Sequence, residues 1–168
     1  MKIALIALFL ATSACAQLPP GSVPVACGPN NVDFKLKMDN SQHEVSQPAP
    51  GKAQIYFIHE SGTFLSLGYP TTKVGIDGAW AGANHSNSWF SASVDPGEHH
   101  VCVTLQSSLV DDRVEFAHFQ AEAGKVYFYR TRLVLSRSVE LLELEPIDSD
   151  QGKYLVASFG LSVSQPKK

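Results

Sequence analysis

The side chains of this sequence that could hold a metal ion do not form a recognisable motif. His99 and His100 are neighbours, but neighbouring side chains on a strand point to opposite faces, so the two do not readily bind one ion. His100 and Cys102 share a face, and Cys27 would supply a third ligand. We favour a Cys27–Cys102 disulfide instead, because two cysteines 75 positions apart without a C-x-x-C pair are a weak zinc signal.

Candidates for acid–base catalysis are equally dispersed. His59-Glu60, His118 and the Asp111-Asp112 pair lie far apart in the chain. Neither a G-x-S-x-G nor an H-E-x-x-H motif accompanies them, so histidines at strand edges are the simpler interpretation. We therefore expect no catalytic residue, no resident metal ion and no cofactor. A His-dependent hydrolase or a metal-dependent enzyme is the less favoured alternative.

Two arginines could bind an anion. Arg130 and Arg132 are two positions apart in an aromatic-rich stretch, which places them on one face of a strand. The commoner outcome is pairing with Glu140, Glu143 or Glu145 on a neighbouring strand. Each such pair contributes about 0.2–1 kcal/mol to stability.

Aromatic side chains offer a further alternative, since a solvent-facing row of them would suit a carbohydrate-binding module. Core packing is the default for most such residues in a β-rich chain. The residues concerned are Trp80, Trp89, Tyr56, Tyr127 and Tyr129.

The N-terminal stretch indicates the compartment in which these side chains work. Lys2 precedes an unbroken apolar run over Ile3–Ala11, and small residues and prolines follow, which is the pattern of an export signal. Ala14-Cys15-Ala16 fits cleavage before Gln17, which would remove Cys15 with the leader. Thr12-Ser13-Ala14-Cys15 resembles a bacterial lipoprotein box, in which Cys15 would be lipidated and become the mature N-terminus. Both processing routes remain open.

Export constrains the rest of the chain. Removing residues 1–16 leaves 152 residues, which is enough for one domain with a sizeable core. The remaining chain has 12 Lys and Arg against 16 Asp and Glu, which is a net charge of −4. No basic run suggests nucleic-acid binding, and membrane attachment would come only from a lipid at Cys15. In an oxidising compartment, Cys27 and Cys102 more often pair than stay free. Because Val101 and Val103 should face the core, the disulfide would pin the N-terminal segment across the outside of the sheet.

Alternating apolar and polar residues, with turn signals at intervals of about ten residues, predict an all-β fold, an antiparallel β-sandwich of about seven or more strands. Asp77-Gly78 and Asp95-Pro96-Gly97 are strong turn signals. Helical signals occur only in Ser149–Phe159, with Ser149 as a candidate cap. The expected organisation is an export signal (1–16), an extended lead-in with one short strand at Val32–Met38 (17–51), a β-sandwich domain (52–160) and a flexible tail (161–168).

Several motifs in a fixed order resemble a known family. The order is Pro50-Gly51-Lys52-Ala53-Gln54-Ile55-Tyr56-Phe57, Lys73-Val74-Gly75-Ile76-Asp77-Gly78, Val94-Asp95-Pro96-Gly97-Glu98-His99 and Ala121-Glu122-Ala123-Gly124-Lys125-Val126-Tyr127-Phe128. Over residues 50–145 this order resembles the exported bacterial proteins of domain-of-unknown-function family number 2846. The stretch V-x-x-D-G … P-G-E-H-x-V also resembles the small β-modules called PEGA domains. The resemblance implies a lipoprotein or secreted protein with a surface or binding role, and it brings no catalytic residue.

The expected function is a non-catalytic binding or assembly module of the bacterial envelope, or a secreted one. Its location would be periplasmic, membrane-anchored by lipid, or outside the cell. The expected partner is an envelope protein or a glycan, and the alternative of a carbohydrate-binding module stays open.

Overall fold

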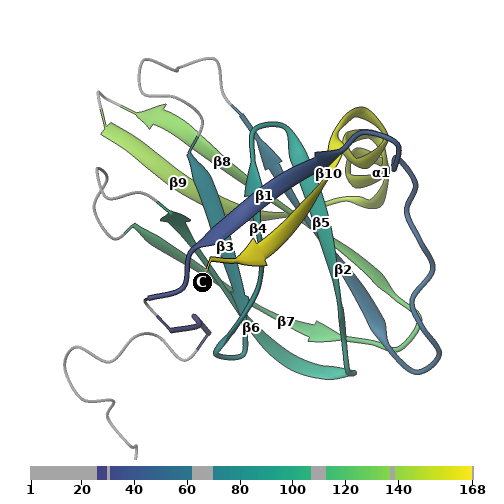
Figure 1. Ribbon diagram of the computed structural model, residues 1–168. Helices are drawn as coiled ribbons and strands as arrows, with labels where there is room; N and C mark the ends of the chain where they lie inside the picture. Colours follow the sequence, from purple (N-terminus) through teal and green to yellow (C-terminus); the bar gives the residue numbers. More distant parts are fainter. Residues whose placement is uncertain (1–25, 30, 62–69, 107–112, 137–138, 168) are drawn as a thin grey trace, which may run out of the picture.

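The computed structural model describes residues 26–29, 31–61, 70–106, 113–136 and 139–167. Within these ranges the chain forms ten strands and one helix, arranged as two stacked sheets with the helix against one of them (Figure 1). The predicted export signal, Cys15, the Asp111-Asp112 pair and the side chain of Glu140 lie outside the described part. The elements are β1 (Phe34–Asp39), β2 (Ala53–Glu60), β3 (Thr71–Ile76), β4 (Ala79–His85), β5 (Ser88–Val94), β6 (Gly97–Gln106), β7 (Val114–Ala121), β8 (Val126–Ser136), β9 (Val139–Ile147), α1 (Ser149–Ser158) and β10 (Gly160–Pro166).

The two sheets differ in how their strands pair. The four-stranded sheet, in the order β4-β3-β6-β7, is antiparallel throughout. The six-stranded sheet, in the order β1-β10-β5-β2-β8-β9, is mixed, because β2 pairs in parallel with β8 and β10 in parallel with β5. The predicted all-β fold with a short C-terminal helix is confirmed, whereas antiparallel pairing throughout holds only for the smaller sheet. Parallel neighbours need a long connection, and between β2 and β8 the chain builds all four strands of the smaller sheet.

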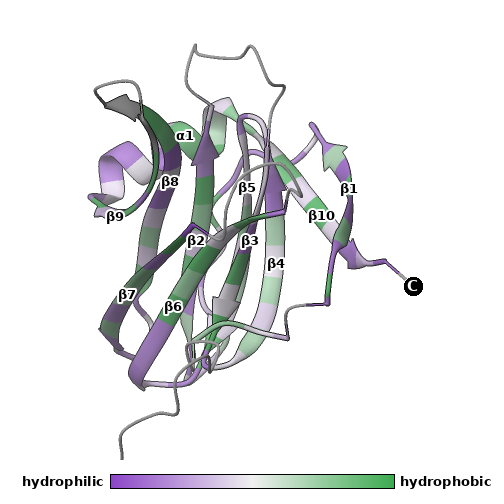
Figure 2. Ribbon diagram, turned by 90° about the vertical axis from the view of Figure 1, so that its left-hand side faces the viewer, coloured by the Kyte–Doolittle hydropathy of each residue, from purple (hydrophilic) through white to green (hydrophobic). Residues whose placement is uncertain are grey.

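The main hydrophobic core lies between the two sheets. Ile55 and Phe57 of β2 and Val101 and Val103 of β6 are fully buried there, each pair two positions apart on its strand. Figure 2 shows the resulting apolar stretches along β2 and β6 at the centre of the molecule. Burial of each such side chain contributes about 1.5–3 kcal/mol, so this core is the main stabilising element of the fold.

A second apolar layer forms on the outer face of the six-stranded sheet, under α1. Leu155 and Val156 of the helix pack against Phe128 of β8. The predicted helix is present, but Asp148 rather than Ser149 caps it, because the Asp148 carboxylate accepts hydrogen bonds from two backbone N–H groups of the first turn. The helix therefore covers an apolar part of this face, and polar side chains of β2, β8 and β9 occupy the part beside it.

Two strands occupy stretches for which the sequence predicts no strand. β4 follows the Asp77-Gly78 turn, and β10 lies in the expected flexible tail. β10 pairs with β1 from Phe34↔Pro166 to Asp39↔Leu161, so the two ends of the described chain hold each other at the sheet edge. The predicted strand of the lead-in is confirmed as β1.

Candidate functional site

An N-terminal strap, residues 26–29 and 31–33, crosses the outer face of the four-stranded sheet. The structure contains the predicted disulfide between Cys27 and Cys102 of β6, with Cα atoms 5.2 Å apart. Cys102 is fully buried on the face opposite Val101 and Val103. The two sulfur atoms therefore form a cross-link, which leaves neither as a thiolate ligand for a metal ion.

Two side chains of the sheet hold the strap further along. Trp80 Nε1 donates a hydrogen bond to the carbonyl of Pro29 (2.8 Å), and Lys73 Nζ donates one to the carbonyl of Val32 (3.0 Å). The Lys73 ammonium also lies 4.7 Å from the centroid of the Trp80 ring, within cation–π range. Burial lowers the pKa of Lys73, and its polar contact with the strap compensates part of the cost of burying the charge.

The Asp77 carboxylate ties the two strongest turn motifs together. Asp77 and Gly78 both have positive φ, 50° and 85°, as expected for the predicted hairpin turn. One Asp77 oxygen accepts a hydrogen bond from the backbone N–H of His100 (2.9 Å), and the other accepts one from His99 Nδ1. His99 Nε2 lies 2.7 Å from the carbonyl of Asp95. The PEGA-like motif thus has a structural role in this chain, as a clasp between neighbouring turns.

The clasp favours a charged His99. Burial opposes the charge, but the hydrogen bonds to the Asp77 carboxylate and the Asp95 carbonyl outweigh burial and raise the pKa of His99. Partial burial of Asp77 likewise favours its neutral form, yet the bonds from His100 and His99 lower its pKa overall. His99 and Asp77 therefore stabilise each other as an ion pair.

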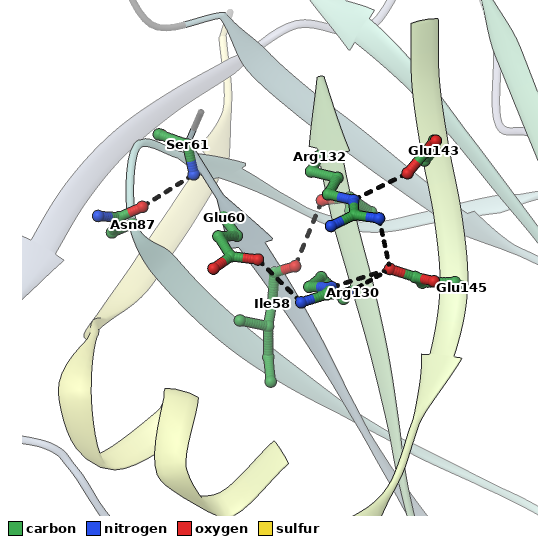
Figure 3. Close-up of polar contacts among 9 residues, drawn as sticks. Ile58, Glu60, Ser61, Asn87, Arg130, Arg132, Glu143 and Glu145 are labelled. Carbon is green, nitrogen blue, oxygen red and sulfur yellow. Dashed lines mark hydrogen bonds and ion pairs between the residues drawn. The ribbon is translucent and has the colours of Figure 1, made fainter. Parts of the chain in front are cut away.

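The histidines considered for acid–base chemistry do not converge. His59 is buried in the interior, with Nδ1 3.1 Å from Thr131 Oγ1, whereas Glu60 points to the other face of β2 toward Arg130 (Figure 3). His118 lies on β7 of the other sheet. Burial, with a smaller effect of nearby His85, lowers the pKa of His59 to about 4, so its ring is neutral at neutral pH. His59 is a core histidine in this arrangement.

Further buried polar side chains occur near His59, toward the end of the sandwich where β2 and β6 end. Thr72 and Asn84 are fully buried there. Asn84 Nδ2 donates to the carbonyl of Phe57 (2.9 Å), but Asn84 Oδ1 and Thr72 Oγ1 have no hydrogen-bond partner within the described ranges. The sequence did not reveal this cluster, because Thr and Asn side chains on a strand are ordinarily expected to face the solvent.

An ion-pair network covers the outer face of β2, β8 and β9 beside α1 (Figure 3). Arg130 donates to Glu60 (3.0 Å) and to Glu145 (Nε, 3.0 Å), and Arg132 donates to Glu143 (2.8 Å). A longer contact of 3.4 Å joins Arg132 to Glu145. The predicted pairing with Glu143 and Glu145 is confirmed. Glu60 of β2 also joins the network, because β2 pairs in parallel with β8, and the sequence did not reveal this pairing. Both guanidinium groups are therefore engaged by carboxylates rather than open to an anion.

A groove of about 440 Å³ adjoins this network where the edges of the two sheets meet. It is lined by Glu115 of β7, Arg132 of β8 and the Leu141–Glu145 stretch of β9. The Leu141 side chain is 44% exposed beside it. Two of its three carboxylates, Glu143 and Glu145, are paired with Arg132 and Arg130, and Glu115 adds a third carboxylate from the β7 side, above an apolar floor. Sequence reasoning did not find this groove, because Glu115 and β9 are brought together only by the packing of the two sheets.

The aromatic residues considered for sugar binding do not form a solvent-facing row. Tyr56, Trp89 and Tyr129 are buried, and Trp80 lies beneath the strap. Tyr127 is half-buried, and its hydroxyl donates to the carbonyl of Gln120. The four other than Trp80 pack in the two apolar layers, and Trp80 packs against the strap.

The residues that the structure describes provide neither a cluster of metal ligands nor a membrane-spanning helix. Among them, no group of three or more His, Cys, Asp or Glu side chains is arranged to hold a metal ion. None of their helices is both long and apolar enough to cross a membrane.

The motifs of the chain agree with a comparison to known protein families. Residues 49–142 match a family of proteins of unknown function, and the chain belongs to this family, DUF2846. An uncharacterized protein of Haemophilus influenzae is 23% identical over 163 residues, which cover 97% of this chain and 84% of that protein. No solved structure matches the chain. The family match begins just before β2 and ends within β9, so it includes the clasp and most of the groove.

Proposed function

We propose that this chain is an exported, non-catalytic binding module of the bacterial envelope. The export pattern at residues 1–17 and the Cys27–Cys102 disulfide support this proposal, because disulfides persist in oxidising compartments. The engagement of Asp77, His99, Arg130 and Arg132 in structural contacts supports a structural rather than a catalytic role for these side chains. Attachment to a membrane would come through a lipid at Cys15, if the chain follows the lipoprotein route.

The observation that carries the binding proposal is the acidic groove between β7 and β9. In the described part of the chain, β7 pairs only with β6 and β9 only with β8, so each has an edge without a partner strand. Such edges accept an extended segment of another protein by strand addition. Glu115 would attract a basic side chain on that segment, since Glu143 and Glu145 are already paired with arginines, and Leu141 offers an apolar contact. The partner is accordingly an envelope protein with an extended, basic segment.

Site-specific photo-crosslinking in the native envelope tests this proposal. A photoreactive amino acid replaces Leu141, and a control chain carries it at Tyr154 of α1, whose side chain is 70% exposed away from the groove. We expect a discrete crosslinked product from position 141 and none from position 154. Glu115→Lys should weaken the crosslink severalfold by reversing one charge of the groove, whereas Glu44→Lys, on the exposed lead-in, should not. Equal crosslinking from both positions, or no effect of Glu115→Lys, would contradict the groove as the binding site.

A further inference from the structure

The interior of the sandwich changes from apolar to polar near the end where β2 ends and β3 begins. Phe57 of β2 and Val74 of β3 belong to the main core, and His59 and Thr72 lie two positions nearer this end on the same faces of these strands. The register places two further polar residues beside His59 and one opposite Thr72. Five fully buried side chains make up this polar layer: His59, Thr72, Asn84, Ser88 and Thr131.

Two members of the polar layer have unused hydrogen-bonding capacity. Thr72 of β3 and Asn84 of β4 are directly opposite each other in an antiparallel pair, so their Cβ atoms are about 4.5–5.5 Å apart. Asn84 Nδ2 donates to the carbonyl of Phe57 (2.9 Å), which identifies Oδ1 as the acceptor end of the amide. Among the described residues, neither Asn84 Oδ1 nor Thr72 Oγ1 has a hydrogen-bond partner. One molecule that reaches both oxygens would satisfy them.

The polar layer favours an uncharged ligand. Burial lowers the pKa of His59 to about 4, so this ring is neutral at neutral pH. The other four side chains of the layer carry no charge at any ordinary pH. An ion enclosed among them would have no opposite charge within the layer, and burying an unpaired charge costs far more than burying a neutral polar molecule.

The ligand must also be small, and it must donate a hydrogen bond. Thr72 and Asn84 are completely buried, so a molecule that reaches their oxygens is enclosed by the sandwich. Asn84 Oδ1 can only accept a hydrogen bond, whereas the Thr72 hydroxyl can donate or accept one. Water is a small molecule that meets both requirements. Ordering one water molecule generally costs less than leaving two buried polar atoms without partners.

We propose that Thr72 and Asn84 bind an internal water molecule within the polar layer. The water donates to Asn84 Oδ1 and accepts from the Thr72 hydroxyl. Because Asn84 Nδ2 also bonds to the carbonyl of Phe57, the water extends a chain of hydrogen bonds from β2 of the larger sheet through β4 to β3 of the smaller sheet. It thereby links the two sheets where the apolar core ends. The site shares no residue with the β7–β9 groove.

Thermal unfolding of the untagged, disulfide-bonded mature chain tests this proposal by the direction of one change. Thr72→Val keeps the shape of the side chain and removes its hydroxyl. If that hydroxyl binds the water, the variant loses a hydrogen bond, and Tm should fall by several degrees. A buried hydroxyl without a partner would instead be replaced to advantage, so an unchanged or raised Tm would overturn the proposal. Thr104→Val, at a half-buried position of β6, is the matched control and should leave Tm nearly unchanged.

A crystal structure of the unaltered mature chain, at a resolution that shows ordered water, does not depend on the folding of any variant. We expect a water oxygen within about 2.5–3.2 Å of both Thr72 Oγ1 and Asn84 Oδ1. A Thr72 hydroxyl bonded to another group of the protein, a solute in contact with both oxygens, or no ordered water at this position would overturn the proposal.

Discussion

At the residue scale, Asp77 has a structural role in the clasp. It accepts hydrogen bonds from the His99 ring and from the His100 backbone at a turn where its own φ is positive. Asp-Gly and Pro-Gly-Glu-His are visible in the sequence as turn signals, but the contact between them depends on the alignment of two hairpins. The turns could therefore be predicted, whereas the clasp could not.

Asp77→Asn should reduce stability in a pH-dependent way. Because the folded protein raises the pKa of His99, its stabilising charge is fully present below the unfolded value of about 6.5 and is lost as the pH rises through the raised pKa. Removing the Asp77 charge should cost about 1 kcal/mol near pH 6 and less at pH 9. Urea unfolding of both proteins across pH 6–9 measures this difference. A constant difference over that range would contradict the ion pair.

His59 should make the fold sensitive to acid. Its folded pKa of about 4 lies below the ordinary 6.5, so between these values the unfolded chain binds a proton that the folded chain does not. Stability should therefore fall as the pH drops from 6.5 to 4, by up to about 3 kcal/mol from this group. His59→Gln should reduce the dependence of the free energy of unfolding on pH between about 4 and 6.5, as measured by urea unfolding, whatever its effect on stability at pH 7. An unchanged pH dependence in the variant would show that other groups cause the loss of stability in acid.

At the scale of elements, strand alternation and turn residues are strong enough to predict most of the fold. β2, β6 and α1 follow the predicted segments closely, because β-forming residues fill β2, apolar residues alternate along part of β6, and turn or capping residues bound each segment, although the cap of α1 is Asp148. β10 was not predicted, since its strand forms against β1, a partner more than a hundred residues away. The parallel pairing of β2 with β8 is likewise absent from local periodicity, because a pattern shows which face is buried but not which strand lies beside it.

Gly152→Ala should destabilise the protein, although the same change usually stabilises an exposed helix by about 1 kcal/mol. A Cβ at position 152 would lie 2.3–2.8 Å from Phe128 side-chain atoms, so α1 would have to move off the sheet. We expect a loss of about 1–3 kcal/mol, as for overpacked cores. Thermal unfolding measures the change, and Ala157→Gly, at an exposed helix position, provides the ordinary propensity effect for comparison. Stabilisation by Gly152→Ala would contradict the close helix–sheet packing.

The strap should detach when its cross-link is removed. The double variant Cys27→Ser/Cys102→Ser should lose about 2–5 kcal/mol and expose residues 26–33 to early proteolysis, while the two sheets stay folded. Gly75→Ala tests the strap without touching sulfur, since its Cβ would lie 2.7 Å from the Ala26 carbonyl oxygen. Limited proteolysis followed by mass spectrometry locates the first cuts. Cleavage that begins inside the sheets, or no change in either variant, would contradict this account of the strap.

At the scale of the whole molecule, the chain combines a β-sandwich with two additions on opposite outer faces. The strap lies on the smaller sheet and is joined to it by a disulfide, and α1 covers part of the larger sheet (Figure 1). The seam between β7 and β9 stays open as the acidic groove, which is where we place partner binding. Such a cross-linked module suits an oxidising compartment, where no reducing system removes the bond.

The most direct test of export is the intact mass of the protein isolated from the envelope and secreted fractions, with free thiols alkylated before any reduction. We expect a chain that begins at Gln17, or one that begins at Cys15 with added acyl mass, and that carries no alkyl group at Cys27 or Cys102. A chain that retains Met1–Ala14, with Cys27 and Cys102 both alkylated, would contradict export and the cross-linked fold together.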